Sequence, residues 1–302
     1  MLGEVFYWVF NMSISATVAG AVILLLGKIK KLPRRFCFGL WIIPFFRFLF
    51  PIGLGSKYSI MSLISKVTTK TVVVYSDTAT FSMTNHVMAA DSYFPIIYKV
   101  NLLENIFSVT SVIWLLVASV ILILYCIFYG ITKTQLRGAV HLCDNIYLSD
   151  KIQTPAVYGI IKPRILLPLM YKEKDLSFIV AHENAHIRRA DNVWRMIALI
   201  TAAVHWFNPF VWLFLKRFLA DMELSCDEMI LAKLNEDDQK AYATLLVDCA
   251  ESKNAFASAF GGAKIYVRIA NILSYRKLSL FSTLCFFSMA IIIAYILLTN
   301  AL

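Results

Sequence analysis

The sequence is short of charge, above all of acidic residues. Only 16% of its 302 residues are charged, with 19 Asp and Glu against 29 Lys and Arg. The remainder is 59% hydrophobic, and the mean hydropathy is +0.69. So little charge in so apolar a chain excludes an ordinary soluble globular protein. It indicates that a lipid bilayer is the solvent for part of the chain.

Cysteine is scarce and poorly spaced for structural chemistry. The six cysteines are scattered and form no Cys-x-x-Cys pair, so neither a disulfide framework nor a cysteine zinc site is indicated. The net charge of +10 is the other imbalance. Because the basic residues gather beside the apolar segments and not in a stripe interleaved with aromatics, we expect them to face anionic membrane lipid and not nucleic acid.

Four apolar segments have about the length that a membrane span needs, roughly 20 residues. Lys and Arg gather at one end of each segment, and the positive-inside rule then puts both chain termini outside. The predicted spans are residues 5–26, 36–54, 106–131 and 278–298, with an external loop at 55–105 and a cytoplasmic domain at 133–277 that holds 19 of the 29 basic residues.

The second predicted span contains Pro44, Pro51 and one charged residue, Arg47. An arginine at that depth either extends to the nearer interface or pairs inside the helix bundle. We favour the first interpretation, because Arg47 lies near the outer end of the segment.

Residues 182–186 read His-Glu-x-x-His, which a random chain of this composition would contain with a probability of roughly 0.002. Residues 176–200 hold no Pro or Gly, repeat apolar residues at helical spacing and follow Asp175, a suitable N-cap. On such a helix the two imidazoles lie one turn apart on one face and can bind one Zn²⁺. Glu183 is then placed to take a proton from a water molecule that the metal activates.

A catalytic zinc site needs a third protein ligand, for which we expect Glu223. Asn208 and Pro209 read as the N-cap and first residue of a returning helix, which makes an antiparallel hairpin. Its two arms differ in length by about 9 Å at 1.5 Å per residue, so the first helix should bend near residues 191–192 or cross the second at an angle. The apolar arms are suited to packing against the spans or entering the bilayer interface.

Several neighbours of these residues compete for a role. Asp227 lies one turn after Glu223, where it can accept a hydrogen bond from a ligand imidazole. Cys226 and Glu228 are rival ligands, although a thiolate beside two histidines is uncommon in hydrolytic sites and Glu228 points away from the Glu223 face. We interpret His205 as structural. Asp191 suits a salt-bridged helix end, with contact to an imidazole as its alternative.

Four short strands are predicted before the zinc helix. An edge strand of such a sheet can hold an extended peptide substrate, and the alternative is that the sheet only supports the helix. The strands are residues 139–142, 146–148, 156–158 and 164–167.

Three motifs follow one another in the chain: His182-Glu183-x-x-His186-x-x-Arg189-x-Asp191, His205-Trp206-Phe207-Asn208-Pro209 and Glu223-x-x-Cys226-Asp227-Glu228. In this order they resemble the membrane metallopeptidase domain of the BlaR/MecR antibiotic-sensing signal transducers. The resemblance extends to Leu40-Trp41 with Arg47, to a Pro and Gly pattern in residues 155–168, and to Arg268.

The resemblance implies a gluzincin site, with His182, His186 and Glu223 on Zn²⁺ and Glu183 as the general base. It also implies a cytoplasmic protease that cleaves a winged-helix transcriptional repressor, and itself near residues 264–277. Members of that family carry an external penicillin-binding domain after the fourth span, for which 302 residues leave no room. We therefore expect either a fragment or a sensorless relative that receives its stimulus through the external loop or a separate sensor protein. Formation of a homodimer is compatible with either case.

The predicted protein is an α-helical integral protein of the bacterial cell membrane, with four spans and a cytoplasmic α+β gluzincin-like zinc metallopeptidase domain. One alternative is a housekeeping membrane protease similar to HtpX or to the CAAX-prenyl endopeptidases. The other is a catalytically silent scaffold or receptor with a structural zinc ion. Glu183 speaks against the scaffold, because a closed structural zinc site has no need of a base beside the metal.

Overall fold

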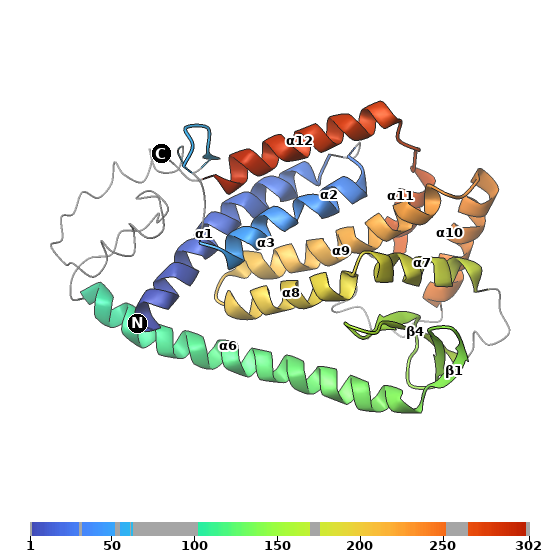
Figure 1. Cartoon of the computed structure of the whole chain (residues 1–302), viewed down its shortest axis with the longest axis horizontal. Coiled ribbons are helices and arrows are strands. Elements are labelled where there is room, and N and C mark those ends of the chain that lie inside the picture. Colours follow the sequence, from blue (N-terminus) through green and yellow to red (C-terminus); the bar gives the residue numbers. More distant parts are fainter. Residues whose placement is uncertain are drawn as a thin grey trace.

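A computed structural model describes residues 2–29, 32–51, 55–60, 62, 102–169, 176–251 and 265–299. Most of the predicted external loop, and the predicted N-cap Asp175, lie outside these residues. Within them, three helices are long and apolar enough to cross a membrane, and they match the first, third and fourth predicted spans (Figure 1). These helices are α1 (Leu2–Leu26), α6 (Leu102–Gln135, continued by a 3-10 turn at Leu136–Gly138) and α12 (Leu280–Leu298).

The second predicted span is two short helices, α2 (Arg34–Leu40) and α3 (Ile42–Leu49). Pro44 explains the interruption at Trp41, because proline has no N–H to donate to the carbonyl of Leu40 and its ring clashes there. Neither helix is long enough alone to count as a membrane span, so the predicted four-span count reduces to three helices of spanning length in the described part of the chain.

Arg47 of α3 does not extend to an interface, and our expectation for it was wrong. The side chain is fully buried inside the helix bundle. Its Nε donates to the carbonyl oxygen of Leu297 at 2.9 Å and its Nη2 to that of Thr299 at 2.5 Å. These carbonyls lie at the C-terminal end of α12, where helix carbonyls have no partner within the helix and carry partial negative charge. Arg47 therefore stabilises the end of the last apolar helix.

The predicted zinc helix is two helices, α7 (Ser177–Arg188) and α8 (Asp191–Val204). Ala190 separates them in the left-handed conformation, with φ 54° and ψ 40°. This conformation costs an alanine roughly 1–2 kcal/mol, and no Pro or Gly announces it. The bend expected near residue 191 is thus a complete break one residue earlier.

The predicted hairpin is confirmed, with α9 (Pro209–Leu231) as its returning arm. Asn208 caps α9 through its Oδ1, which accepts from the Phe210 N–H at 2.9 Å. The arms of the hairpin pack in one apolar core with α1, α2, α3 and α12. The packing is close enough to require Gly20 in α1, where a Cβ would lie 2.3 Å from the ring of Phe214.

The tip of the hairpin lies at the level of the middle of α1. The Asn208 Nδ2 donates to the Ser13 Oγ at 2.8 Å and to the Thr17 Oγ1 at 2.7 Å. His205, which is fully buried, donates from Nε2 to the carbonyl oxygen of Phe48 at 3.0 Å. His205 therefore has a structural contact far from the other histidines, and the apolar arms pack against the predicted spans.

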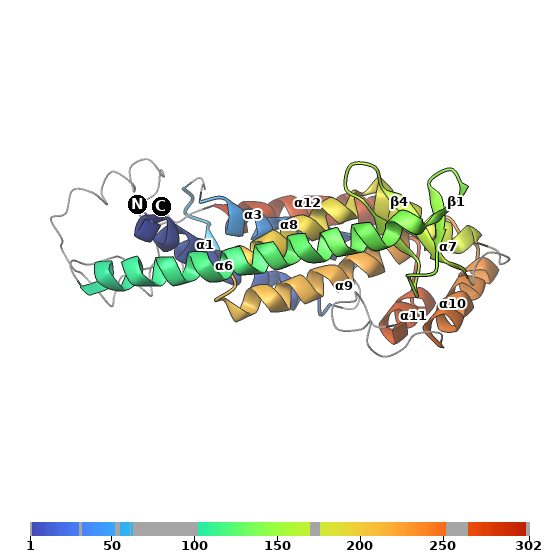
Figure 2. The ribbon, with the colours of Figure 1, turned by 90° about the horizontal axis from the view of Figure 1, so that it is seen from below.

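A four-stranded sheet lies beside α7, at the end of α6 (Figures 1 and 2). Its order is β1-β2-β4-β3, with β2 and β4 parallel and the other pairs antiparallel. Apolar side chains of β2 and β4 pack with Ile179 of α7, which supports the helix that carries the histidines. The strands are β1 (Val140–Cys143), β2 (Ile146–Ser149), β3 (Ala156–Tyr158) and β4 (Arg164–Pro168), each within two residues of its prediction.

Two more helices, α10 (Glu236–Glu251) and α11 (Ile265–Leu273), complete this end of the molecule. They pack together and against the end of α9, through Tyr242, Ala243 and Ile272. The segment after α11 leads directly into α12. This arrangement brings side chains of α10 and α11 beside α7.

The burial of Arg47 yields a stability prediction. Arg47→Ala leaves two α12 carbonyls without a charged donor, so we expect the free energy of unfolding to fall by about 2–3 kcal/mol, while Arg47→Lys loses less. Thermal unfolding of the purified protein in detergent measures this, with the exposed Lys57→Ala as control. An Arg47→Ala protein that melts with the wild type would contradict the buried pairing.

Candidate metal centre

The two histidines of α7 face each other one turn apart. His182 and His186 are buried, and their Nε2 atoms lie 3.1 Å apart. Apolar contacts of α7 with the sheet orient this face of the helix toward α9. The helical spacing therefore produces the pair of imidazoles that the motif predicts.

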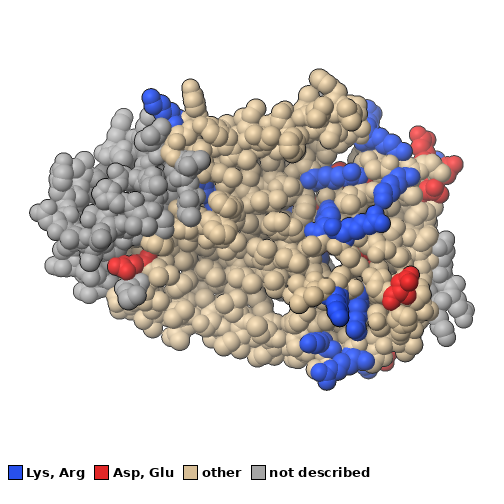
Figure 3. Space-filling view, in the orientation of Figure 1, with Lys and Arg blue, Asp and Glu red and all other residues tan. Residues whose placement is uncertain are grey.

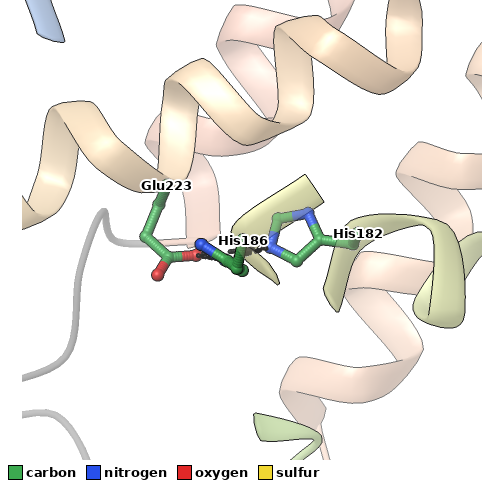
Figure 4. Close-up of side chains that lie close together, drawn as sticks. All are labelled: His182, His186 and Glu223. Carbon is green, nitrogen blue, oxygen red and sulfur yellow. Dashed lines mark hydrogen bonds and ion pairs between the residues drawn. The ribbon is translucent and has the colours of Figure 1, made fainter. Parts of the chain in front are cut away.

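Glu223 of α9 completes a triangle with them (Figure 4). Its Oε2 lies 3.4 Å from the His182 Nε2 and 3.7 Å from the His186 Nε2. Ligand atoms at 2.0–2.1 Å from a tetrahedral Zn²⁺ are about 3.3 Å apart, so the three distances match the edges of such a site. Two imidazoles and one carboxylate are also a donor set that zinc accepts.

The electrostatics of the triangle favour a cation. Burial raises the pKa of Glu223, but the charge of His186 and hydrogen bonds from both histidines outweigh it and hold that pKa well below its usual range. Burial lowers the pKa of His186, but Glu223 and Asp191 raise it well above its usual value. Carboxylates thus contact both imidazoles, an arrangement that also suits a divalent cation.

Asp227 contacts the outer nitrogen of His182. Its Oδ1 lies 3.2 Å from the His182 Nδ1 and accepts a hydrogen bond from the Tyr242 hydroxyl at 2.7 Å. That hydroxyl lies 3.0 Å from the same Nδ1. Such a carboxylate sets the tautomer and the plane of an imidazole, and leaves the Nε2 lone pair for a metal.

Asp191 has the same relation to His186. Its Oδ2 lies 2.6 Å from the His186 Nδ1, and Arg189 donates to both of its oxygens. Arg189 also donates to the Ser225 Oγ at 2.6 Å, which joins α7 to α9. The break at Ala190 makes this possible, because a continuous helix would carry Asp191 to another face. Asp191 therefore has both of the roles considered for it, a salt-bridged helix end through Arg189 and contact with an imidazole.

The rival ligands differ in position. The Cys226 Sγ lies 3.3 Å from the His186 Nδ1, on the far side of the ring from the triangle, and 3.4 Å from the Asp191 Oδ2. Glu228 lies away from both rings, where it accepts from the backbone N–H groups of Arg34 and Arg35 at 2.9 and 3.1 Å. It caps the N-terminus of α2 and links that helix to α9.

Glu183 is only 7% exposed, and no described residue lies within hydrogen-bonding or ion-pairing distance of its carboxylate. Its oxygens are not among the buried polar atoms without a partner in the described residues, so they reach solvent and are free to contact a water molecule or a substrate. A cavity of about 50 Å³ lies between β3 and the start of α8, lined in part by Val157, Gly159, His186 and Asn192. Asn192 donates to the carbonyl oxygen of Gly159 at 2.8 Å and so lies over this edge of the sheet.

Two residues of the centre received no role from the sequence, Tyr242 and Arg268. Nothing in the sequence marks Tyr242, which comes from α10. Arg268 belonged to the resemblance but had no function there. Its guanidinium donates to both oxygens of Asp227, from Nε at 2.8 Å and from Nη2 at 2.6 Å.

Comparison with known proteins finds a family and several relatives that the chain resembles. A family model described as BlaR1 peptidase M56 matches residues 7–272. The regulatory protein BlaR1 of Bacillus licheniformis is 29% identical over 113 residues, 36% of this chain and 19% of that protein. The methicillin resistance mecR1 protein of Staphylococcus aureus (strain Mu50) is 27% identical over 114 residues, which cover 36% of this chain and 20% of that protein. The regulatory protein BlaR1 of Staphylococcus aureus is 27% identical over 161 residues, which cover 48% of this chain and 27% of that protein. The matched segments span about a fifth to a quarter of the length of these relatives.

The pairing of Asp227 with Arg268 yields a prediction on stability and pH. Burial would raise the pKa of Asp227, but Arg268 lowers it to about 2 from the ordinary 3.8. Asp227→Asn leaves a largely buried guanidinium unpaired, so we expect it to lose about 3 kcal/mol of unfolding free energy near pH 7. Because the folded-state pKa is depressed, this advantage of the wild type persists above the ordinary pKa and disappears as the pH falls through about 2.

The measurement is thermal unfolding of the metal-free protein in detergent between pH 7 and pH 2. Asp237→Asn, whose carboxylate is exposed on α10, is the control and should melt with the wild type throughout. A constant difference between the wild type and Asp227→Asn down to pH 2 would argue against an ionised Asp227 in the folded protein.

Proposed function

The chain belongs to the BlaR1 peptidase M56 family, a family of metallopeptidases, and on this basis we propose that it is a membrane-bound zinc endopeptidase. The observation that carries the proposal is the triangle of His182, His186 and Glu223, at the separations of a tetrahedral metal site, with the unpaired Glu183 beside it. We assign these three residues as the zinc ligands and Glu183 as the general base.

Zinc bound there would supply Lewis acidity to water and to the substrate carbonyl. Glu183 takes a proton from the attacking water and returns it to the nitrogen of the cleaved peptide bond. Asp227 with Tyr242, and Asp191 with Arg189, hold the two imidazoles with their Nε2 atoms inward. A catalytically silent scaffold leaves Glu183 unexplained, since a site that only holds metal has no need of a free carboxylate beside the metal ligands.

We propose that the substrate is a cytoplasmic protein and that cleavage is part of transmembrane signalling. Two relatives are named regulatory proteins and one is a methicillin resistance protein, which supports a signalling role over general protein turnover. The resemblance to the BlaR/MecR transducers extends the proposal to a winged-helix repressor as substrate and to self-cleavage near residues 264–277.

For the topology, we propose that α2 and α3 together make a second crossing and that the metal centre lies on the cytoplasmic side. In Figure 3, Lys and Arg gather at the end of the molecule that holds the sheet and α7, while the surface along the helices is almost free of charge. A positive band of this kind marks the cytoplasmic boundary of a membrane protein.

Cysteine labelling tests this topology. In a chain whose exposed Cys126, Cys143 and Cys285 are replaced by serine, a membrane-impermeant maleimide applied to intact cells should label Lys57→Cys. It should label Lys151→Cys only after the cells are lysed. Labelling of Lys151→Cys in intact cells would reverse the proposed orientation.

Replacing the base tests the enzyme. Glu183→Gln should keep the fold and one bound zinc per chain but lose at least ~100-fold in proteolysis, because the proton transfer is lost. New protein N-termini in cells that express the wild type, but not the variant, identify the substrate by mass spectrometry. Zinc is measured in the purified proteins, and Glu236→Gln, exposed on α10, is the matched control. Equal cleavage by Glu183→Gln would end the enzyme proposal.

A further inference from the structure

Arg268 reaches the metal centre from α11, far along the chain from both motifs that build it. Its guanidinium is 13% exposed and lies flat against Asp227, which accepts from Nε and Nη2. A two-point contact of this kind holds the plane of a guanidinium, which a single contact does not. The rest of the guanidinium is therefore held in a defined direction.

That direction is toward the metal-binding face of the triangle. The Nη2 lies 3.4 Å from the His182 Nε2 and 3.5 Å from its Nδ1, and the Nη1 lies 3.9 Å from the Glu223 Oε2. The His182 Nε2 and the Glu223 Oε2 are proposed metal ligands. No described residue accepts a hydrogen bond from the Nη1, so its N–H groups are available at the edge of the site.

A fixed cation beside a site for a divalent cation is unfavourable unless it serves a purpose. The carboxylate of Asp227 offsets the positive charge of Arg268 through Nε and Nη2, and the N–H groups of Nη1 remain able to donate. Arg195 also lies near Glu223, with its Nη2 3.7 Å from the Oε1, but its side chain is 43% exposed. Arg189 is held by the carboxylate of Asp191 on the outer side of His186, so among the described residues Arg268 is the arginine that a carboxylate fork holds within 4 Å of atoms of two proposed ligands.

We propose that Arg268 is a catalytic residue, whose Nη1 donates a hydrogen bond to the carbonyl oxygen of the scissile peptide as that oxygen becomes negative. This inference rests on the proposed peptidase function. When the oxygen of water forms a bond to the carbonyl carbon, the π electron pair moves onto the carbonyl oxygen and Glu183 takes the proton. The electron pair on that oxygen then forms the C=O bond again, the C–N bond breaks with its electron pair going to nitrogen, and nitrogen takes the proton from Glu183.

A preorganised donor to such an oxyanion acts mainly in the transition state, so its loss lowers kcat and not substrate binding. For a peptide that spans a cleavage site identified with the wild type, Arg268→Gln should lower kcat about 100-fold. The KM should stay within about twofold and the zinc content should not change. Arg268→Lys retains a cation with one compact donor and should recover part of kcat.

A phosphinic analogue of the same peptide separates catalysis from support of the fold. Its tetrahedral oxygen imitates the oxyanion, so its Ki should rise in Arg268→Gln by the same factor by which kcat/KM falls. Loss of kcat without a matching rise in Ki would overturn the proposal, as would a larger loss in Arg195→Gln than in Arg268→Gln. Arg276→Gln, in the exposed segment after α11, is the control.

The outcomes separate this inference from the peptidase proposal. If the wild type cleaves nothing and equals Glu183→Gln, the peptidase function fails. If the wild type cleaves, Glu183→Gln does not, and Arg268→Gln keeps its kcat, only the role of Arg268 fails. Should Arg268→Gln not fold, Arg268→Lys carries the same comparison of kcat with Ki.

Discussion

The pairing of buried charges is the constraint on which this structure depends. Helix α9 carries four largely buried carboxylates, and each has a partner from a segment far away in sequence. An unpaired charge in such a place costs several kcal/mol, so the chain has to bring the partners together. The pairs are Asp221 with Trp41, Glu223 with the two histidines, Asp227 with Arg268 and Tyr242, and Glu228 with the N-terminus of α2.

Because these carboxylates point to two sides, α9 connects the apolar helix bundle to the candidate metal centre. Asp221 and Glu228 face α2, the first of the two short helices in the second predicted span. Glu223 and Asp227 face α7 and α11. Arg189 adds a further contact between α7 and α9 through Ser225. The histidines are therefore held in place by the same helix that packs among the apolar helices.

The C-terminal part of the chain is anchored by two arginines. Arg268 leaves α11 for the metal centre, and the end of α12 accepts hydrogen bonds from Arg47. Between these two anchored points of the chain lie only the end of α11, a short segment and α12. The last apolar helix is thus joined at one end to the second predicted span and, through α11, to the residues around His182.

The sequence by itself determined the parts of the protein that depend on local periodicity. Uninterrupted apolar runs predicted α1, α6 and α12, alternating apolar residues with turn signals predicted the four strands, and helical spacing placed His182 and His186 on one face. The Asn208-Pro209 pair predicted the hairpin and thereby the position of Glu223 near the histidines. In the structure its Oε2 lies 3.4 Å from the His182 Nε2. All of these signals act within a few residues of the chain, where composition and backbone geometry are sufficient.

Only the tertiary structure decided the features that arise from long-range pairing. Ala190 adopts a left-handed conformation because Asp191 pairs with His186 and Arg189, and no residue type in the sequence announces that break. Arg47 is buried because carbonyls 250 residues away accept its hydrogen bonds. Tyr242 and Arg268 join the metal centre for the same reason. A buried polar group takes the partner that the completed fold provides, and neither spacing nor propensity carries that information.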